Sequence, residues 1–357
     1  MKNKIFLLAV TITIIVSACN LRNAAMNKQL KIRPLVDTVG FAQYPWQMDA
    51  LMERFESSGW KSKSDPSSWL LAICPHDDYT YTGYIYPELL QNVRASNLIL
   101  IGVAHKAAKL KIEDSLVFDS YSSWKGPWKD VGISPAREEI FDLLRKKCAI
   151  KSDTLQRVEH SVEAMIPFLQ YFNRNVRIVS VLVPAMSPER MKECGKELAE
   201  AIRTVAKRHN WKWGKDFAIV VTTDAVHYGN EDWGGTDRAL FGCDSAGNAR
   251  ALDREHEIID NCLTGQLTPE KIRLFSTYTL NSDNYREYKW TWCGRYSVPV
   301  ALYTGYYLNE SQPLNGELVD YSTSITRLHT PVDDIGMGRT AIATQCHWVG
   351  YAAIGFR

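Results

Sequence analysis

The chain has 357 residues, of which 45% are hydrophobic, 23% charged and 11% aromatic. This is the composition of an ordinary globular protein, which excludes a disordered chain, a collagen-like repeat and a coiled coil. The 42 basic and 40 acidic residues leave a formal charge of only +2, so no nucleic-acid partner is expected.

Residues 1–18 have the pattern of a secretory signal peptide. Lys2 and Lys4 provide a positively charged start, and the mainly apolar stretch 5–16 follows them. This stretch is too short to span a bilayer. The segment Val16-Ser17-Ala18-Cys19 resembles a bacterial lipobox, in which Cys19 becomes the lipidated first residue of the mature chain. A plain secretory signal followed by a chance cysteine is the alternative.

The lipobox pattern predicts a protein of the bacterial cell envelope that is held in the membrane by a lipid anchor and faces the periplasm or the exterior. Residues 19–45 are expected to form a tether, and 46–357 to form the domain. Of eight cysteines, lipidation of Cys19 leaves seven, and an odd number cannot all form disulfides. The chain has no CxxC motif, so neither a zinc ribbon nor a thioredoxin-type pair is indicated.

Short apolar runs alternate with helical patterns along the domain. In chain order we expect a helix at about 46–58, strands at 69–74 and 97–103, helices at 135–147 and 161–172, a strand at 176–183, a helix at 188–209, a strand at 217–222, a helix at 248–264, and terminal strands within 340–344 and 349–356. Such alternation predicts a single α/β domain with a mainly parallel central sheet flanked by helices.

Three of the four internal apolar runs are followed by a histidine. These histidines are His76, His105 and His227, and Asp224 precedes the last of them. Because the carboxyl ends of parallel strands meet at one crevice, we expect these side chains to lie together. Imidazole is the commonest protein ligand for metals, and a carboxylate can fix its tautomer. A strand-end histidine that bonds the backbone is the structural alternative.

Two further motifs carry reactive side chains. Residues 159–163 read EHSVE, in which Ser161 and the glutamates suit the start of a helix. Residues 292–295 read WCGR. A lone cysteine is most often a small buried hydrophobe, but the neighbouring Arg295 would favour the thiolate of Cys293, which is the form that binds metal.

Five segments occur in the order and spacing of one known family. They are PHDDYTYTG (75–83), GVAH (102–105), EHSVEAMIPFLQ (159–170), TTDAVHYG (222–229) and WCGR (292–295). From about residue 69 to its end, the chain thereby resembles the MEMO-like family, also called the AmmeMemoRadiSam system protein B family. The resemblance implies a fold similar to the catalytic subunit of class III extradiol dioxygenases, which are non-haem iron enzymes.

The resemblance also implies a pocket with a metal-ligand set of His76, His105 and Cys293, and with Asp224 and His227 beside it. The chain departs from the family in the first motif. The family usually reads PHAGY, and here Asp77 and Asp78 replace the alanine and the glycine. The added carboxylate is either a further ligand or solvated, and we expect it to be solvated.

A second departure is Val103-Ala104, which replaces a Pro-Ser before the second histidine. The cysteine ligand also replaces a carboxylate of the extradiol enzymes, so we do not predict cleavage of catechols.

Three functions fit these observations. The first is a metal-dependent oxidoreductase that uses iron or copper, with His227, held by Asp224, as general acid or base and His160 lining the pocket. The second is a non-catalytic module that binds a small molecule or peptide in a cleft lined by aromatic residues. Those residues would be Tyr79, Tyr81, Tyr228 and Trp292. The third is a zinc hydrolase, since two histidines, a cysteine and an open position also suit zinc.

Overall fold

Five parallel strands form the centre of the sheet in the computed structural model, which describes residues 30–62, 67–229 and 238–357. In spatial order they are β6 (Val131–Ile133), β8 (Arg177–Val183), β3 (Asn97–Val103), β9 (Phe217–Thr222) and β2 (Leu71–Cys74). Every residue of β2 and β9 is buried, as expected for strands covered on both faces. Four of the five match the apolar runs, so the prediction of a mainly parallel α/β domain is confirmed.

Further strands, both antiparallel and parallel, extend this centre to a mixed sheet of 13 strands within the described residues. Beside β2 lie β13 (His347–Phe356), β12 (Asn315–Thr323) and β11 (Gly265–Gln266), and β10 (His227–Gly229) pairs with β13. Beyond β6 lie β5 (Ser123–Trp124) and β1 (Ile32–Arg33), while β4 (Leu116–Phe118) and β7 (Ala149–Lys151) branch from β8. The prediction of a strand at 340–344 is wrong. Only an isolated bridge from Thr344 to His347 forms there.

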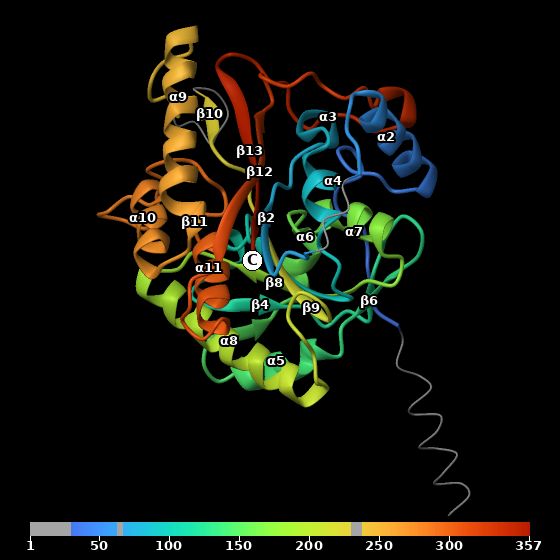
Figure 1. Cartoon of the computed structure of the whole chain (residues 1–357), viewed down its shortest axis with the longest axis vertical. Helices are drawn as coiled ribbons and strands as arrows, with labels where there is room; N and C mark the ends of the chain where they lie inside the picture. The colour runs from blue at the N-terminus through green and yellow to red at the C-terminus, as the bar shows by residue number, and fades with distance from the viewer. Residues whose placement is uncertain (1–29, 63–66, 230–237) are drawn as a thin grey trace, which may run out of the picture.

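Helices cover both faces of the sheet (Figure 1). On one side lie α5 (Ala136–Leu144), α8 (Pro188–His209), α10 (Pro269–Thr279) and α11 (Ser297–Leu308). On the other lie α2 (Pro45–Ser57), α4 (Ile85–Leu90) and α7 (Ile166–Phe172). The remaining helices are α3 (Tyr79–Thr82), α6 (Asp153–Val158) and α9 (Ser245–Ile258), with short 3-10 or π turns at Ala108–Leu110, Glu163–Met165, Ile259–Leu263 and Asp333–Ile335.

Alternation along the strands divides the core into two layers. Ile99 and Ile101 of β3 point into the cluster beneath α8 and α11, whereas Leu98 and Leu100 point into the cluster beneath α4 and α7. The long helix α8 begins where it was predicted, because the Ser187 hydroxyl accepts a hydrogen bond from the Arg190 backbone N–H.

Packing of the domain begins before residue 46, where the sequence placed its start. Arg33 is 1% exposed and pairs with Glu163 at 2.5 Å, and Phe41 is buried. The second half of the expected tether therefore lies against the domain. The predicted signal peptide and the lipidated Cys19 lie outside the described residues. Among the residues described, no helix combines the length and the apolar character needed to cross a membrane.

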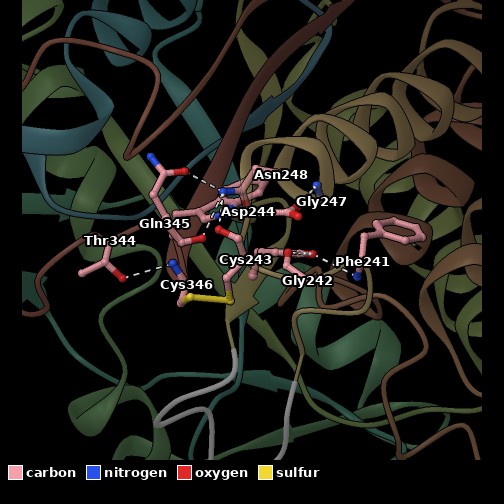
Figure 2. Close-up of a disulfide and its surroundings, with 11 residues drawn as sticks. Phe241, Gly242, Cys243, Asp244, Gly247, Asn248, Thr344, Gln345 and Cys346 are labelled. Carbon is pink, nitrogen blue, oxygen red and sulfur yellow. Dashed lines mark hydrogen bonds between the residues drawn. A yellow bond between two sulfur atoms is a disulfide. The ribbon is translucent and has the colours of Figure 1, made fainter.

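A disulfide joins Cys243, just before α9, to Cys346, just before β13 (Figure 2). It links two positions that are 103 residues apart in the chain. Beside it, the Asn248 side-chain amide of α9 donates hydrogen bonds to the backbone and side-chain oxygens of Gln345 at 3.1 and 2.6 Å. The cysteines with free thiols in the described part are all buried: Cys74, Cys148, Cys194, Cys262 and Cys293.

Candidate metal centre

The ends of neighbouring strands bring three side chains together. His76 follows β2 and His105 follows β3, while Cys293 approaches from the loop before α11. One ligand atom from each lies within 4.8 Å of the other two, and Cys293 Sγ is 3.4 Å from His76 Nε2. The fold therefore produces the juxtaposition expected of these residues, although they are far apart in the sequence.

Gly294 allows the cysteine loop to reach the end of β9. A Cβ atom at this position would lie 2.4 Å from the Thr223 side chain, which is closer than atoms can pack. The Gly294 N–H also donates to the Thr223 hydroxyl at 2.8 Å. Only glycine therefore lets Cys293 sit beside the histidines in this backbone arrangement.

Thr222, which sequence reasoning missed, determines the tautomer of His76. The Thr222 hydroxyl donates to the Pro75 carbonyl at 3.2 Å, so it accepts from His76 Nδ1 at 2.9 Å. The proton is then on Nδ1, and the Nε2 lone pair faces Cys293. Burial, together with repulsion from His105, lowers the pKa of His76 well below its usual value. His76 is thus a neutral imidazole, which is the form that binds metals.

Glu159 orients His105 through the same ring nitrogen but favours the protonated ring. One carboxylate oxygen accepts from His105 Nδ1 at 2.9 Å, and the other accepts from the His105 backbone N–H at 2.7 Å. Burial lowers the pKa of His105, but the Glu159 charge and hydrogen bonds to Cys293 and Glu159 outweigh burial and raise it to about 10. Burial raises the pKa of Glu159, but the charge of His105 and its hydrogen bond outweigh it and lower the pKa to about 2.

The expected helix-start role of the EHSVE motif is wrong. Glu159 holds His105 instead, and the buried Ser161 hydroxyl donates to the Val103 carbonyl at the end of β3 at 2.9 Å. Glu163 pairs with Arg33. The helical run begins at Glu163 as a 3-10 turn without a side-chain cap and continues as α7 from Ile166.

Cys293 is buried, and burial raises the pKa of its thiol, although His105 acts in the opposite direction. Its sulfur accepts a hydrogen bond from the Asp224 backbone N–H at 3.1 Å. The expected influence of Arg295 on this thiol is wrong, because the Arg295 guanidinium lies 3.4 Å from the centre of the Tyr288 ring instead. His105 is the partner that favours the thiolate.

Asp224 and His227 both line a cavity of about 260 Å³ that opens onto His76 and His105. This is possible because the chain turns after Thr222 before β10 begins. The His227 Nε2 and Asp224 Oδ2 atoms are 3.9 Å apart. Burial and repulsion from His105 lower the pKa of His227 to about 3. Burial and the charge of Asp77 raise the pKa of Asp224 well above its usual value.

His160 lines the same cavity, and its ring stacks on that of His105 with centroids 5.0 Å apart. Burial lowers its pKa to about 4. Two further sets of three residues have ligand atoms that lie within 4.8 Å of one another inside each set. One is His105, Glu159 and His160, and the other is Asp224, His227 and Cys293.

Glu255 of α9 is a second residue that sequence reasoning missed. It is fully buried, and one of its oxygens accepts hydrogen bonds from the indole N–H groups of Trp290 and Trp292 at 2.6 and 2.7 Å. The other oxygen accepts from the Val226 backbone N–H at 3.0 Å. Glu255 therefore ties the loop that carries Asp224 to the loop that carries Cys293. Burial raises its pKa.

A model of the family described as Memo-like protein matches residues 40–334. The chain belongs to the Memo-like family. A MEMO1 family protein of Methanothermobacter thermautotrophicus is 30% identical over 175 residues, which are 47% of this chain and 58% of that protein. One of Archaeoglobus fulgidus is 21% identical over 317 residues, which are 88% of this chain and 96% of that protein. The chain thus aligns with just over half the length of the first relative and with nearly all of the second.

Where it departs from the family pattern, this Memo-like protein buries Asp78 and partly buries Asp77. Asp78 is 2% exposed and accepts a hydrogen bond from the Thr340 N–H at 2.5 Å. Asp77 accepts from the Tyr351 hydroxyl at 2.6 Å. The expectation of a solvated side chain is therefore wrong, because the segment before β13 folds over the motif. Burial and the charge of Asp77 raise the pKa of Asp78 to about 7.

The expected aromatic cleft does not form from the four residues named for it. Tyr79, Tyr228 and Trp292 are fully buried in the core. Tyr81 alone of the four lines the cavity beside His76. The aromatic residues of these motifs pack the domain rather than form a recognition surface.

Proposed function

We propose that this Memo-like protein binds a transition-metal ion through His76, His105 and Cys293 and acts as a metal-dependent oxidoreductase with iron or copper. The observation that supports this most is the state of the two imidazoles. Thr222 and Glu159 engage both Nδ1 atoms, so both Nε2 atoms remain for a metal beside the cysteine sulfur. A metal ion would displace the second proton that His105 holds at its raised pKa. Metal-binding histidines are commonly held in this way by their second ring nitrogen.

The donor set fits such an ion. Two imidazoles and one thiolate suit iron, copper or zinc, and three protein ligands leave positions for a substrate. Bound iron or copper would supply electron transfer to or from that substrate. Zinc, which has no redox chemistry, would instead make the protein a hydrolase.

Asp224 and His227 are the groups that we assign to proton transfer. The low pKa of His227 keeps its ring neutral, so the unprotonated form of the imidazole lines the cavity. The raised pKa of Asp224 lets its carboxyl hold a proton. Both line the cavity that adjoins the proposed ligands, and His160 forms part of its wall. Groups in such positions typically contribute about 10²–10⁴-fold to a rate.

We further propose that the protein works in the cell envelope, anchored by lipid at Cys19. The Cys243–Cys346 disulfide supports an exported location, because disulfides persist in oxidising compartments and are rare in the cytosol.

Elemental analysis of the mature protein, purified without oxygen, tests the metal proposal. We expect about one iron or copper ion per chain, and loss of that ion in His76→Ala, His105→Ala and Cys293→Ala. Cys262→Ala is the matched control, since it removes another buried free thiol that is not part of the centre. A metal-free wild-type protein that also fails to take up iron or copper would refute the proposal. Stoichiometric zinc would refute the redox assignment.

A further inference from the structure

A second cavity, of about 460 Å³, adjoins the proposed centre and shares His105 with the first. Cys293 also lies in its wall. Much of the remaining wall is apolar or aromatic, including Val103, Ile112, Val183, Pro184, Tyr288 and Tyr296. The proposed ligands therefore stand between two spaces, one with Asp224 and His227 and the other largely apolar.

Arg295 is the exceptional residue of this second cavity. It lines the cavity and is only 8% exposed. Its guanidinium lies over the Tyr288 and Tyr296 rings, 3.4 and 4.6 Å from their centres, and Nη2 donates to the Arg286 carbonyl at 3.0 Å. Its buried Nε has no hydrogen-bond partner within the described residues.

A buried guanidinium without an anion is costly, because arginine stays charged and loses its hydration. The tyrosine faces offset part of this cost. An oxyanion in the cavity that Arg295 lines would offset the rest of this cost, because it would pair with the charge and accept hydrogen bonds from the guanidinium.

The other charged groups of the cavity also favour an anion. Lys111 and Arg286 line it, and Glu113 is the one carboxylate of its wall. Glu113 pairs with Arg286 at 2.7 Å, where both side chains are about half exposed. Among the described residues, Lys111 and Arg295 therefore have no ion-pair partner, and both line an apolar space.

We propose that this cavity binds a small organic carboxylate, with the carboxylate on Arg295 and the apolar body against the wall that carries His105 and Cys293. The carboxylate is the substrate class of the proposed metal centre, so its role as a substrate rests on the proposed function. Binding of the anion itself needs no metal. The apolar wall favours an organic anion over inorganic phosphate, which would leave that wall uncovered.

Calorimetric titration with benzoate tests the proposal, in metal-free and in metal-loaded protein. Benzamide has nearly the same shape without the charge and is the matched ligand control. We expect saturable binding of benzoate, and at least about tenfold weaker binding of benzamide. Arg295→Gln should weaken benzoate binding by at least about tenfold, while Arg295→Lys, which keeps the charge, should retain part of the affinity. Arg254→Gln, at an exposed ion pair outside the cavity wall, should change it less than about threefold.

Metal content and thermal midpoint of each variant are measured in parallel. Absence of benzoate binding to the wild type, equal binding of benzamide, or unchanged affinity in both Arg295 variants would each overturn the assignment. Tighter binding of inorganic phosphate than of benzoate would also overturn it. If benzoate binds but no metal does, the metal proposal fails and the anion pocket stands. If metal binds but benzoate does not, only the anion pocket is rejected.

Discussion

Replacement of Glu159 tests how far a single carboxylate prepares the proposed centre. Its two oxygens accept four hydrogen bonds, from His105 Nδ1 and from the backbone N–H groups of His105, His160 and Ser161, at 2.7–3.1 Å. Every partner is a donor. Oε1 accepts three of these bonds, and Oε2 accepts the bond from the His105 backbone N–H. The amide of Glu159→Gln can place its oxygen at the Oε1 position. Its NH₂ group, a donor, then faces the His105 backbone N–H, which is also a donor. Glu159→Ala removes every acceptor.

We expect Glu159→Ala to weaken metal binding more than Glu159→Gln does. Removal of a carboxylate that supports a metal-binding histidine typically weakens metal affinity by about 10–100-fold, which equals about 1.4–2.8 kcal/mol. Glu159→Gln keeps the three bonds to one oxygen but loses the charge, so we expect about tenfold weaker binding. Glu159→Ala also frees the His105 ring to rotate, so we expect a value near a hundredfold.

Competition titration with a chromophoric chelator measures these affinities for iron(II) and for copper. Glu163→Gln is the matched control, because Glu163 belongs to the same motif but pairs with Arg33 and with backbone N–H groups near residue 36. It should lower stability and leave metal affinity within about twofold. Wild-type affinity in both Glu159 variants would refute the view that Glu159 orients His105 for a metal.

Four further results are expected. His227→Ala should keep most of the bound metal in elemental analysis, and a collapse of metal content would instead make His227 a ligand. The double replacement of Cys243 and Cys346 by serine should lower the free energy of unfolding in urea by up to about 4–5 kcal/mol, because their disulfide closes a loop of 103 residues; an unchanged midpoint would contradict this. The raised pKa of Glu255 means that the native state keeps a proton that the unfolded chain has lost, so its contribution to stability falls as pH rises above about 4.5. Urea unfolding of Glu255→Gln should show a flatter pH dependence, and an identical slope would speak against it. Cys19→Ala should release the protein from membranes and lose an acyl label, and unchanged membrane fractionation would exclude the anchor.

Local patterns in the sequence were sufficient for the centre of the sheet and for most of the helices that show amphipathic periodicity. The strands around 71–74 and 97–103 are buried on both faces, so their apolar runs are continuous and conspicuous. Helix α11 was not predicted. Nearly all of its residues are buried, so it shows no polar face from which a helical period could be recognised. β12 escaped because most of its residues are partly exposed and mixed in character.

The sequence also indicated which side chains meet in the centre, since the ends of parallel strands converge and the five motifs resemble one family. Only the tertiary structure decided how they are held. Glu159 was expected to serve a helix end, and it holds His105 because the chain folds the motif against the end of β3. Thr222 and Glu255 gave no signal, because a hydroxyl or carboxylate acquires its role from partners that are distant in the chain. Hydrogen bonds between such partners depend on packing in three dimensions, which periodicity and spacing along one chain do not encode.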